Sequence, residues 1–141
     1  MTLLYPEWIV DPESNFLIRL FLRDHIKRYE FASKFVKGKK VLDLGCGSGY
    51  GSYILAKAAK RVMGIDISKE AIQLAHKKYK RVNIEYVRSD ARYLDLSNDS
   101  FDTIISFESI EHLTLADAKI FLKEIARVLK PFGELIISTP V

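Results

Sequence analysis

The chain has 141 residues, of which 48% are hydrophobic and 28% charged, and its formal net charge at pH 7 is +4. These values fit a single soluble globular domain with a real core. No apolar stretch approaches the roughly 20 residues that a membrane-spanning helix needs. Residues 1–10 lack a basic start, so we expect no signal peptide. The single cysteine excludes an intramolecular disulfide and a cysteine-based zinc site, and we expect a cytoplasmic protein.

The chain divides into an N-terminal helical segment, residues 1–36, and an α/β domain, residues 37–141. In the first part, Asp11 and Pro12 form a favourable helix opening, and a helical pattern runs over residues 13–36 with a break expected near His25. In the second part, strands and helices alternate, which predicts a doubly wound, mainly parallel sheet of about five strands. The predicted strands are residues 40–44, 61–65, 83–87, 101–106 and 134–138, and the predicted helices are residues 52–59, 69–79 and 114–130.

A glycine-rich loop follows the first predicted strand, where residues 43–49 read Asp-x-Gly-x-Gly-x-Gly. Glycine allows a tight turn and close approach of the backbone to a ligand. The dinucleotide pattern G-x-G-x-x-G does not fit, because its third glycine would fall on Tyr50 or Ser52. No Gly-Lys-Ser/Thr follows, so the Walker pattern fails as well. The loop alone leaves two interpretations, a nucleotide-binding turn and a plain glycine turn.

Acidic residues stand at the ends of the next two strands, where a parallel sheet places its ligand. Asp66 lies 21 residues beyond Gly45, and a carboxylate there can accept both hydroxyls of a ribose. Asp90 and Ala91 follow the third strand and could bond an adenine edge. Ordinary exposed loop acids remain the alternative for both aspartates.

Five motifs in this order resemble those of the class I S-adenosylmethionine-dependent methyltransferases: residues 43–49, 64–68, 89–91, 101–106 and 129–135. The resemblance implies a Rossmann-like methyltransferase fold with S-adenosylmethionine as cofactor. It further implies that Asp43 helps to hold the amino end of the cofactor through water, and that Asp66 holds the ribose. The other implied cofactor-binding residues are Gly45, Cys46, Gly47 and Gly49 at the methionine part, Ile67, Asp90 and Ala91 at the adenine, and Phe107 near the sulfonium.

Methyl transfer is an in-line displacement at an activated methyl group, so the enzyme contributes mainly alignment. A base is needed only where the acceptor must lose a proton. The candidates follow the fourth strand and are Glu108, Glu111 and His112. His112 has an ordinary pKa close to working pH, although a histidine at a helix entrance is often a surface or capping residue. No set of histidine and acidic residues has metal-ligand spacing, so we expect no metal.

The residues directly after the fourth strand narrow the class of acceptor. Base-amine methyltransferases carry Asn/Asp-Pro-Pro-Tyr/Phe there, whereas residues 106–109 read Ser-Phe-Glu-Ser. A finer resemblance, which includes His25-x-x-Arg28-Tyr29, is to small-molecule methyltransferases that accompany sugar or polysaccharide synthesis. It implies that Arg28 and Tyr29 close over the cofactor, with a core aromatic as the alternative for Tyr29.

Three functions remain open: methyl transfer to a small-molecule or sugar hydroxyl or amine, a non-catalytic cofactor-binding module or fragment working with a partner, and RNA methylation. The basic clusters at residues 37–40 and 77–81 fit solvated helix ends better than nucleic-acid contacts. The usual family sheet has seven strands, and the C-terminal strands are missing here. We therefore expect residues 134–138 to form an unpaired edge strand, through which a homodimer could form.

Overall fold

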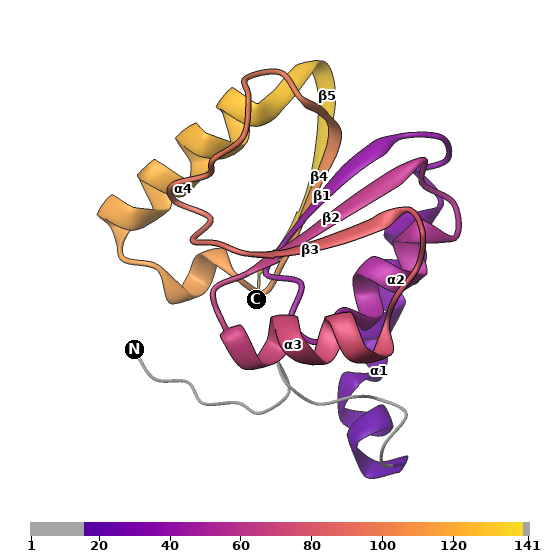
Figure 1. Cartoon of the computed structure of the whole chain (residues 1–141). Coiled ribbons are helices and arrows are strands. Elements are labelled where there is room, and N and C mark those ends of the chain that lie inside the picture. The colour runs from indigo at the N-terminus through magenta and orange to yellow at the C-terminus, as the bar shows by residue number, and fades with distance from the viewer. Residues whose placement is uncertain (1–15, 140–141) are drawn as a thin grey trace.

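The computed structural model describes the backbone of residues 16–139 and the side chains of residues 23–139. Its five strands form one parallel sheet in the order β3-β2-β1-β4-β5 (Figure 1). This confirms the predicted doubly wound α/β fold. The elements are α1 (Phe16–Ser33), β1 (Lys40–Leu44), α2 (Tyr50–Ala56), β2 (Arg61–Asp66), α3 (Lys69–Lys78), β3 (Ile84–Arg88), β4 (Phe101–Phe107), the 3-10 turn η2 (Ile110–His112), α4 (Leu115–Val128) and β5 (Leu129–Ser138).

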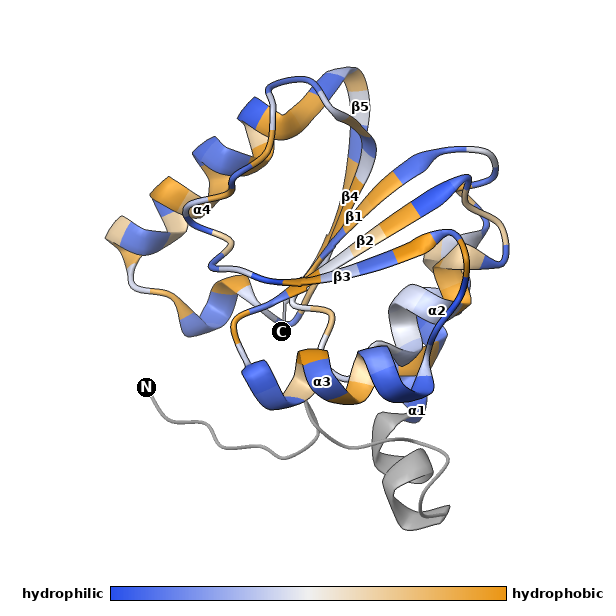
Figure 2. Ribbon diagram, in the orientation of Figure 1, coloured by the Kyte–Doolittle hydropathy of each residue, from blue (hydrophilic) through white to orange (hydrophobic). Residues whose placement is uncertain are grey.

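The sheet is covered on both faces, which explains its nearly continuous apolar strands. Helices α1, α2 and α3 pack on one face, and α4 packs on the other. Figure 2 shows hydrophobic residues along the central strands, whereas α3 and α4 alternate between hydrophobic and hydrophilic positions. On the α1 face, the ring of Tyr29 packs so closely on α2 that a Cβ at Gly51 would lie 2.2 Å from it.

Two helices begin at a residue whose side chain caps the first turn. The Ser68 hydroxyl accepts a hydrogen bond from the Ala71 amide at the start of α3. The Thr114 hydroxyl accepts from the Asp117 amide at the start of α4. Each cap satisfies one backbone donor that the helix itself leaves unpaired.

Several predicted boundaries are wrong. Helix α2 spans Tyr50–Ala56 and not residues 52–59. Helix α1 runs through His25 without a break, since Phe16–Ser33 contains neither proline nor glycine to interrupt it. Helix α4 ends at Val128 and not at residue 130, because Leu129 turns to extended backbone and pairs with Phe101. Strand β5 therefore begins before Pro131, with an irregular register and a positive φ of 65° at Phe132. The expected helix opening at residues 11–12 lies outside the described residues.

Strand β5 lies at an edge of the sheet, as predicted, and among the described residues it pairs only with β4. Strand β3 forms the other edge. Within residues 16–139, no helix is both long and apolar enough to cross a membrane.

Candidate cofactor site

The glycine loop lies at the carboxyl end of β1, between β2 and β4. Gly45, Gly47 and Gly49 all have left-handed backbone, with φ values of 76°, 56° and 94°. A Cβ at Gly45 would lie 2.6 Å from the Ser109 hydroxyl, and one at Gly49 would lie 2.8 Å from the Cβ of Ala75. Only glycine adopts these φ values readily while leaving that space, so the sequence pattern has a direct structural cause.

Asp66 holds this loop against the end of β2. Its carboxylate accepts hydrogen bonds from the Gly47 amide and the Ser68 amide, both at 2.9 Å. The carbonyl of Ile65 accepts from the amides of Gly45 and Cys46 at 2.8 and 2.9 Å. Burial raises the pKa of Asp66, while the two amides favour its charged form. The carboxylate thus stands at the end of β2 with the loop already folded around it.

Asp43, the acid that precedes the loop, is fully buried. Its two carboxylate oxygens accept hydrogen bonds from the Tyr29 hydroxyl at 3.0 Å and the Ser52 hydroxyl at 2.6 Å. Burial raises the pKa of Asp43 to about 7, although both hydrogen bonds oppose the shift. Asp43 therefore links α1 and α2 to the end of β1 inside the protein.

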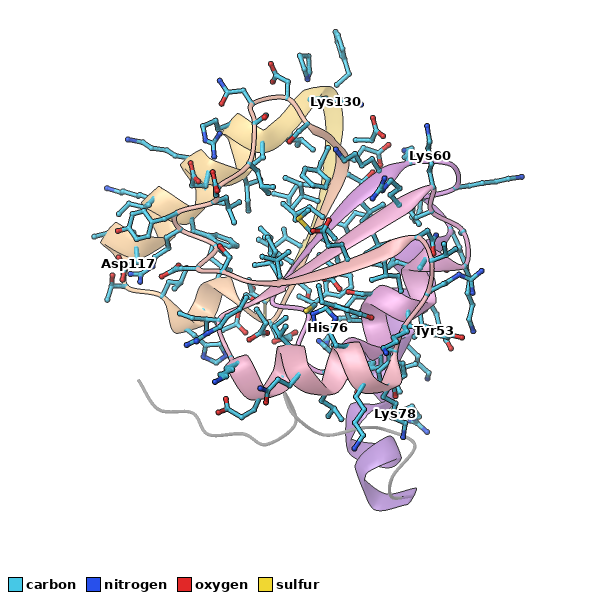
Figure 3. The ribbon with its side chains drawn as sticks, viewed as in Figure 1. Tyr53, Lys60, His76, Lys78, Asp117 and Lys130 are labelled. Carbon is cyan, nitrogen blue, oxygen red and sulfur yellow. The ribbon has the colours of Figure 1, made fainter. Side chains whose placement is uncertain are left out.

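The side chains predicted for the adenine lie beside Asp66. Ile67 is 62% exposed, which is unusual for an isoleucine. The Asp90 carboxylate is held by the Arg92 guanidinium at 2.7 Å, and this hydrogen bond lowers the pKa of Asp90. Arg92 also forms an ion pair at 3.0 Å with Asp117, at the start of α4 (Figure 3). Asp90 is thus fixed in place, and Ala91 next to it is half-buried.

The three candidate bases lie close together after β4. Glu108 has a left-handed φ of 55°, and its amide donates to the Ser138 carbonyl at the end of β5. Its carboxylate forms an ion pair with Arg28 at 3.2 Å. Burial raises the pKa of Glu111, and the neighbouring charge of Glu108 raises it further. The Nε2 atom of His112 lies 3.6 Å from the Glu111 carboxylate.

The side chain of Tyr29 on α1 lies elsewhere than the finer family resemblance implies. Tyr29 is only 1% exposed and its hydroxyl is turned to Asp43, so it is a core aromatic and does not close over the site. Arg28, by contrast, lies at the surface beside Glu108. Phe107 is buried at the end of β4 and stacks edge-on against Tyr29 at 4.9 Å. Cys46 is buried as well, which suits a small loop residue and not a nucleophile.

Sequence reasoning missed one pair of residues at this edge of the sheet. The Nδ1 atom of His25 on α1 forms a hydrogen bond with the Tyr50 hydroxyl at the start of α2. Burial and the nearby Arg28 charge together lower the pKa of His25 to about 4. The i, i+3, i+4 spacing of His25, Arg28 and Tyr29 indicates one helix face, but it does not reveal Tyr50 as the partner.

A parallel sheet with a glycine loop after β1 and an acid at the end of β2 defines a nucleotide-binding domain of the Rossmann-like class. A family model described as a methyltransferase domain matches residues 42–137. The chain therefore belongs to this family, and its fold is that of the class I S-adenosylmethionine-dependent methyltransferases.

Similar proteins agree with this assignment. A probable S-adenosylmethionine-dependent methyltransferase of Mycolicibacterium smegmatis is 35% identical over 120 residues, covering 85% of this chain and 45% of that protein. A ubiquinone biosynthesis O-methyltransferase of Coxiella burnetii is 39% identical over 106 residues, covering 74% of this chain and 44% of that protein. The solved PH0226 protein of Pyrococcus horikoshii OT3 has a TM-score of 0.80 at 34% identity, covering 95% of this chain and 62% of its own. The chain spans less than half the length of these two curated relatives.

Proposed function

We propose that this chain binds S-adenosylmethionine at the carboxyl ends of β1, β2 and β4 and takes part in methyl transfer to a small-molecule or sugar hydroxyl or amine. The observation that carries the proposal is the clamp between Asp66 and the Gly47 amide, which holds a loop of three left-handed glycines. Family membership identifies the cofactor as S-adenosylmethionine. The hydrogen bond between Asp66 and the Gly47 amide supports the glycine loop as the place where it would bind.

The residues at this edge suit the parts of the cofactor. Each Asp66 oxygen that accepts a backbone amide still has a lone pair with which to accept a ribose hydroxyl. The exposed side chain of Ile67 would cover one face of the adenine, and Asp90 and Ala91 would meet its edge. The loop at Gly45, Cys46, Gly47 and Gly49 would line the methionine part with backbone.

At the methionine end, the roles of Asp43 and Arg28 differ. Both oxygens of Asp43 are already bonded within the protein, so it would act on the cofactor indirectly, by fixing the end of β1 beside the amino group of the cofactor. The Arg28 side chain is 39% exposed, and its guanidinium would bind the cofactor carboxylate. Phe107 would form the apolar wall near the sulfonium.

Bound S-adenosylmethionine supplies the activated methyl group. The chain would hold the acceptor beside it, and where the acceptor is a hydroxyl, a side chain after β4 would receive its proton. Glu111 and His112 are our candidates for this base. Burial raises the pKa of Glu111, which makes its carboxylate a stronger base, and the Nε2 atom of His112 lies 3.6 Å from that carboxylate. Glu108 would serve less directly, because its carboxylate is already engaged in the ion pair with Arg28.

A cofactor-binding module that works with a partner is the second candidate. It is favoured by a similar solved structure, a complex of the Haloferax volcanii Trm112 methyltransferase activator with a putative methyltransferase, which matches at 29% identity and a TM-score of 0.72 and covers 84% of this chain and 54% of that chain. The partner could be a second copy paired through the β5 edge, in a cytoplasmic protein. RNA methylation is less favoured because Lys39 is already paired with Glu134, and Lys77 and Lys78 lie in the last turn of α3.

Isothermal titration calorimetry with S-adenosylhomocysteine tests the central claim. We expect binding, and we expect Asp66→Ala to weaken it by at least about tenfold through loss of charged hydrogen bonds. Asp95→Ala, at an exposed loop acid, is the control and should bind as the unchanged protein does. Absence of both binding heat and thermal stabilisation in the unchanged protein would refute the proposal. Steeply salt-dependent RNA binding would favour RNA methylation, and light scattering would test the dimer.

A further inference from the structure

One short face of α1 contacts three segments of the cofactor site. Residues 25, 28 and 29 lie on this face, one turn apart. Each reaches a different segment: the start of α2, the residue after β4, or the end of β1. The three contacts are His25 with Tyr50, Arg28 with Glu108, and Tyr29 with Asp43.

The His25 ring is half-buried on this face. Aromatic rings of Tyr29, Tyr50 and Phe107 surround it edge-on, with centroid distances of 5.3, 5.7 and 6.4 Å. A polar ring in such surroundings needs a hydrogen-bond partner, and the Tyr50 hydroxyl supplies it. The charged groups that act on the ring are Arg28 of the same helix and Glu108 after β4.

Tyr50 stands where the glycine loop becomes a helix. It directly follows Gly49, whose left-handed φ is 94° and whose carbonyl accepts the first hydrogen bond of α2 from the Tyr53 amide. The upstream end of the loop is held by the Ile65 carbonyl, its middle by Asp66, and the Gly49 carbonyl at its downstream end accepts a hydrogen bond from the Tyr86 hydroxyl of β3 at 3.2 Å. The Tyr50 side chain is therefore the place where α1 can hold the downstream end.

We infer that His25 is a positioning residue of the cofactor site: through its hydrogen bond to Tyr50 it fixes the downstream end of the loop and holds α1 beside it. The inference rests on the proposed function, because it matters only if the cofactor binds at this loop. It assigns His25 no contact with the reacting atoms. His25 instead makes the loop geometry depend on α1, which lies outside the matched family segment of residues 42–137.

The test is calorimetry with S-adenosylhomocysteine on the unchanged chain and four variants: His25→Ala, His25→Gln, Tyr50→Phe, and the double variant His25→Ala/Tyr50→Phe. Loss of one hydrogen bond should weaken binding by about fivefold to tenfold in His25→Ala and in Tyr50→Phe. The double variant should be no weaker than either single variant, because both remove the same bond. His25→Gln should retain most of the affinity, since its amide can bond the hydroxyl.

Tyr53→Phe is the matched control, because it also removes one hydroxyl from α2 but its ring packs against Tyr79 and not against His25 (Figure 3). The affinity of this control should be unchanged. Tyr50→Phe removes only one oxygen atom, so it tests the inference even if His25→Ala does not fold. Unchanged affinity in Tyr50→Phe, or additive losses in the double variant, would overturn the inference while leaving the proposed function intact. Lack of binding by the unchanged chain would instead overturn both.

Discussion

Replacing Asp43 with asparagine should change how the stability of this protein depends on pH. In the folded chain the carboxyl is fully buried, and its pKa is raised from 3.8 to about 7. The unfolded chain therefore releases this proton near pH 4, while the folded chain keeps it until near pH 7. Deprotonation thus favours unfolding over this interval, and the Asp43 contribution lowers the free energy of unfolding as pH rises from 4 to 7.

The size of the effect follows from the shift. A change of about three pKa units corresponds to about 4 kcal/mol, since each unit is about 1.36 kcal/mol. In the unchanged protein, His25 has the opposite effect on how stability depends on pH. Its pKa is lowered from 6.5 to about 4, so its contribution weakens stability as pH falls through that range. Between pH 4 and 6.5 the contributions of Asp43 and His25 to the pH dependence of the free energy of unfolding partly cancel. Only a comparison of variants separates these two contributions.

Urea unfolding followed by circular dichroism, at pH values from 4 to 8, measures the difference between Asp43→Asn and the unchanged chain. The lost hydrogen bond adds a constant destabilisation of about 1–3 kcal/mol at every pH. Relative to that constant, the variant should gain about 4 kcal/mol between pH 4 and 8. As a control, Asp102→Asn should show a nearly constant difference over this range, because the Lys40 amide and Lys130 lower the pKa of Asp102 below its ordinary value of 3.8 and its titration lies below pH 4. A difference for Asp43→Asn that stays constant within about 1 kcal/mol would refute the reasoning.

Two further substitutions test packing and ligand contact. Gly51→Ala should destabilise the fold by about 1–3 kcal/mol in thermal unfolding, because the new Cβ would meet the Tyr29 ring at 2.2 Å. In a Tyr29→Leu background the same change should cost less, and an equal loss in both backgrounds would contradict this contact. Ile67→Ala should weaken S-adenosylhomocysteine binding by about threefold to tenfold, with no loss of stability, because the side chain is 62% exposed. Val82→Ala, at another exposed aliphatic side chain near β3, should leave the affinity unchanged, and an equal effect in both variants would argue against an adenine contact.

Local features of the sequence predicted most of the fold. Strand β1 was predicted with its observed ends, because its apolar residues are buried on both faces. The caps at Ser68 and Thr114 depend on residues only three positions apart, which sequence reasoning can see. The start of β5 was missed because it depends on Leu129 pairing with Phe101, which lies 28 residues earlier.

In the candidate site, too, short motifs predict the positions of residues, whereas contacts between distant residues appear only in the structure. The position of Asp66 at the end of β2 follows from the spacing of the motif, but its bonds to the Gly47 and Ser68 amides appear only in the folded chain. The inward turn of Tyr29 toward Asp43 and the bond between His25 and Tyr50 join elements that are 14 and 25 residues apart. Such contacts depend on the packing of α1 on α2, for which no short motif exists.

The clamp of the glycine loop by Asp66 and Ile65 has a consequence for the rate of ligand capture. Hydrogen bonds within the protein hold the backbone of this loop, so we expect little of its conformational entropy to be lost on binding. Association should then resemble docking onto a rigid surface, with a rate constant that depends on encounter and not on slow loop ordering.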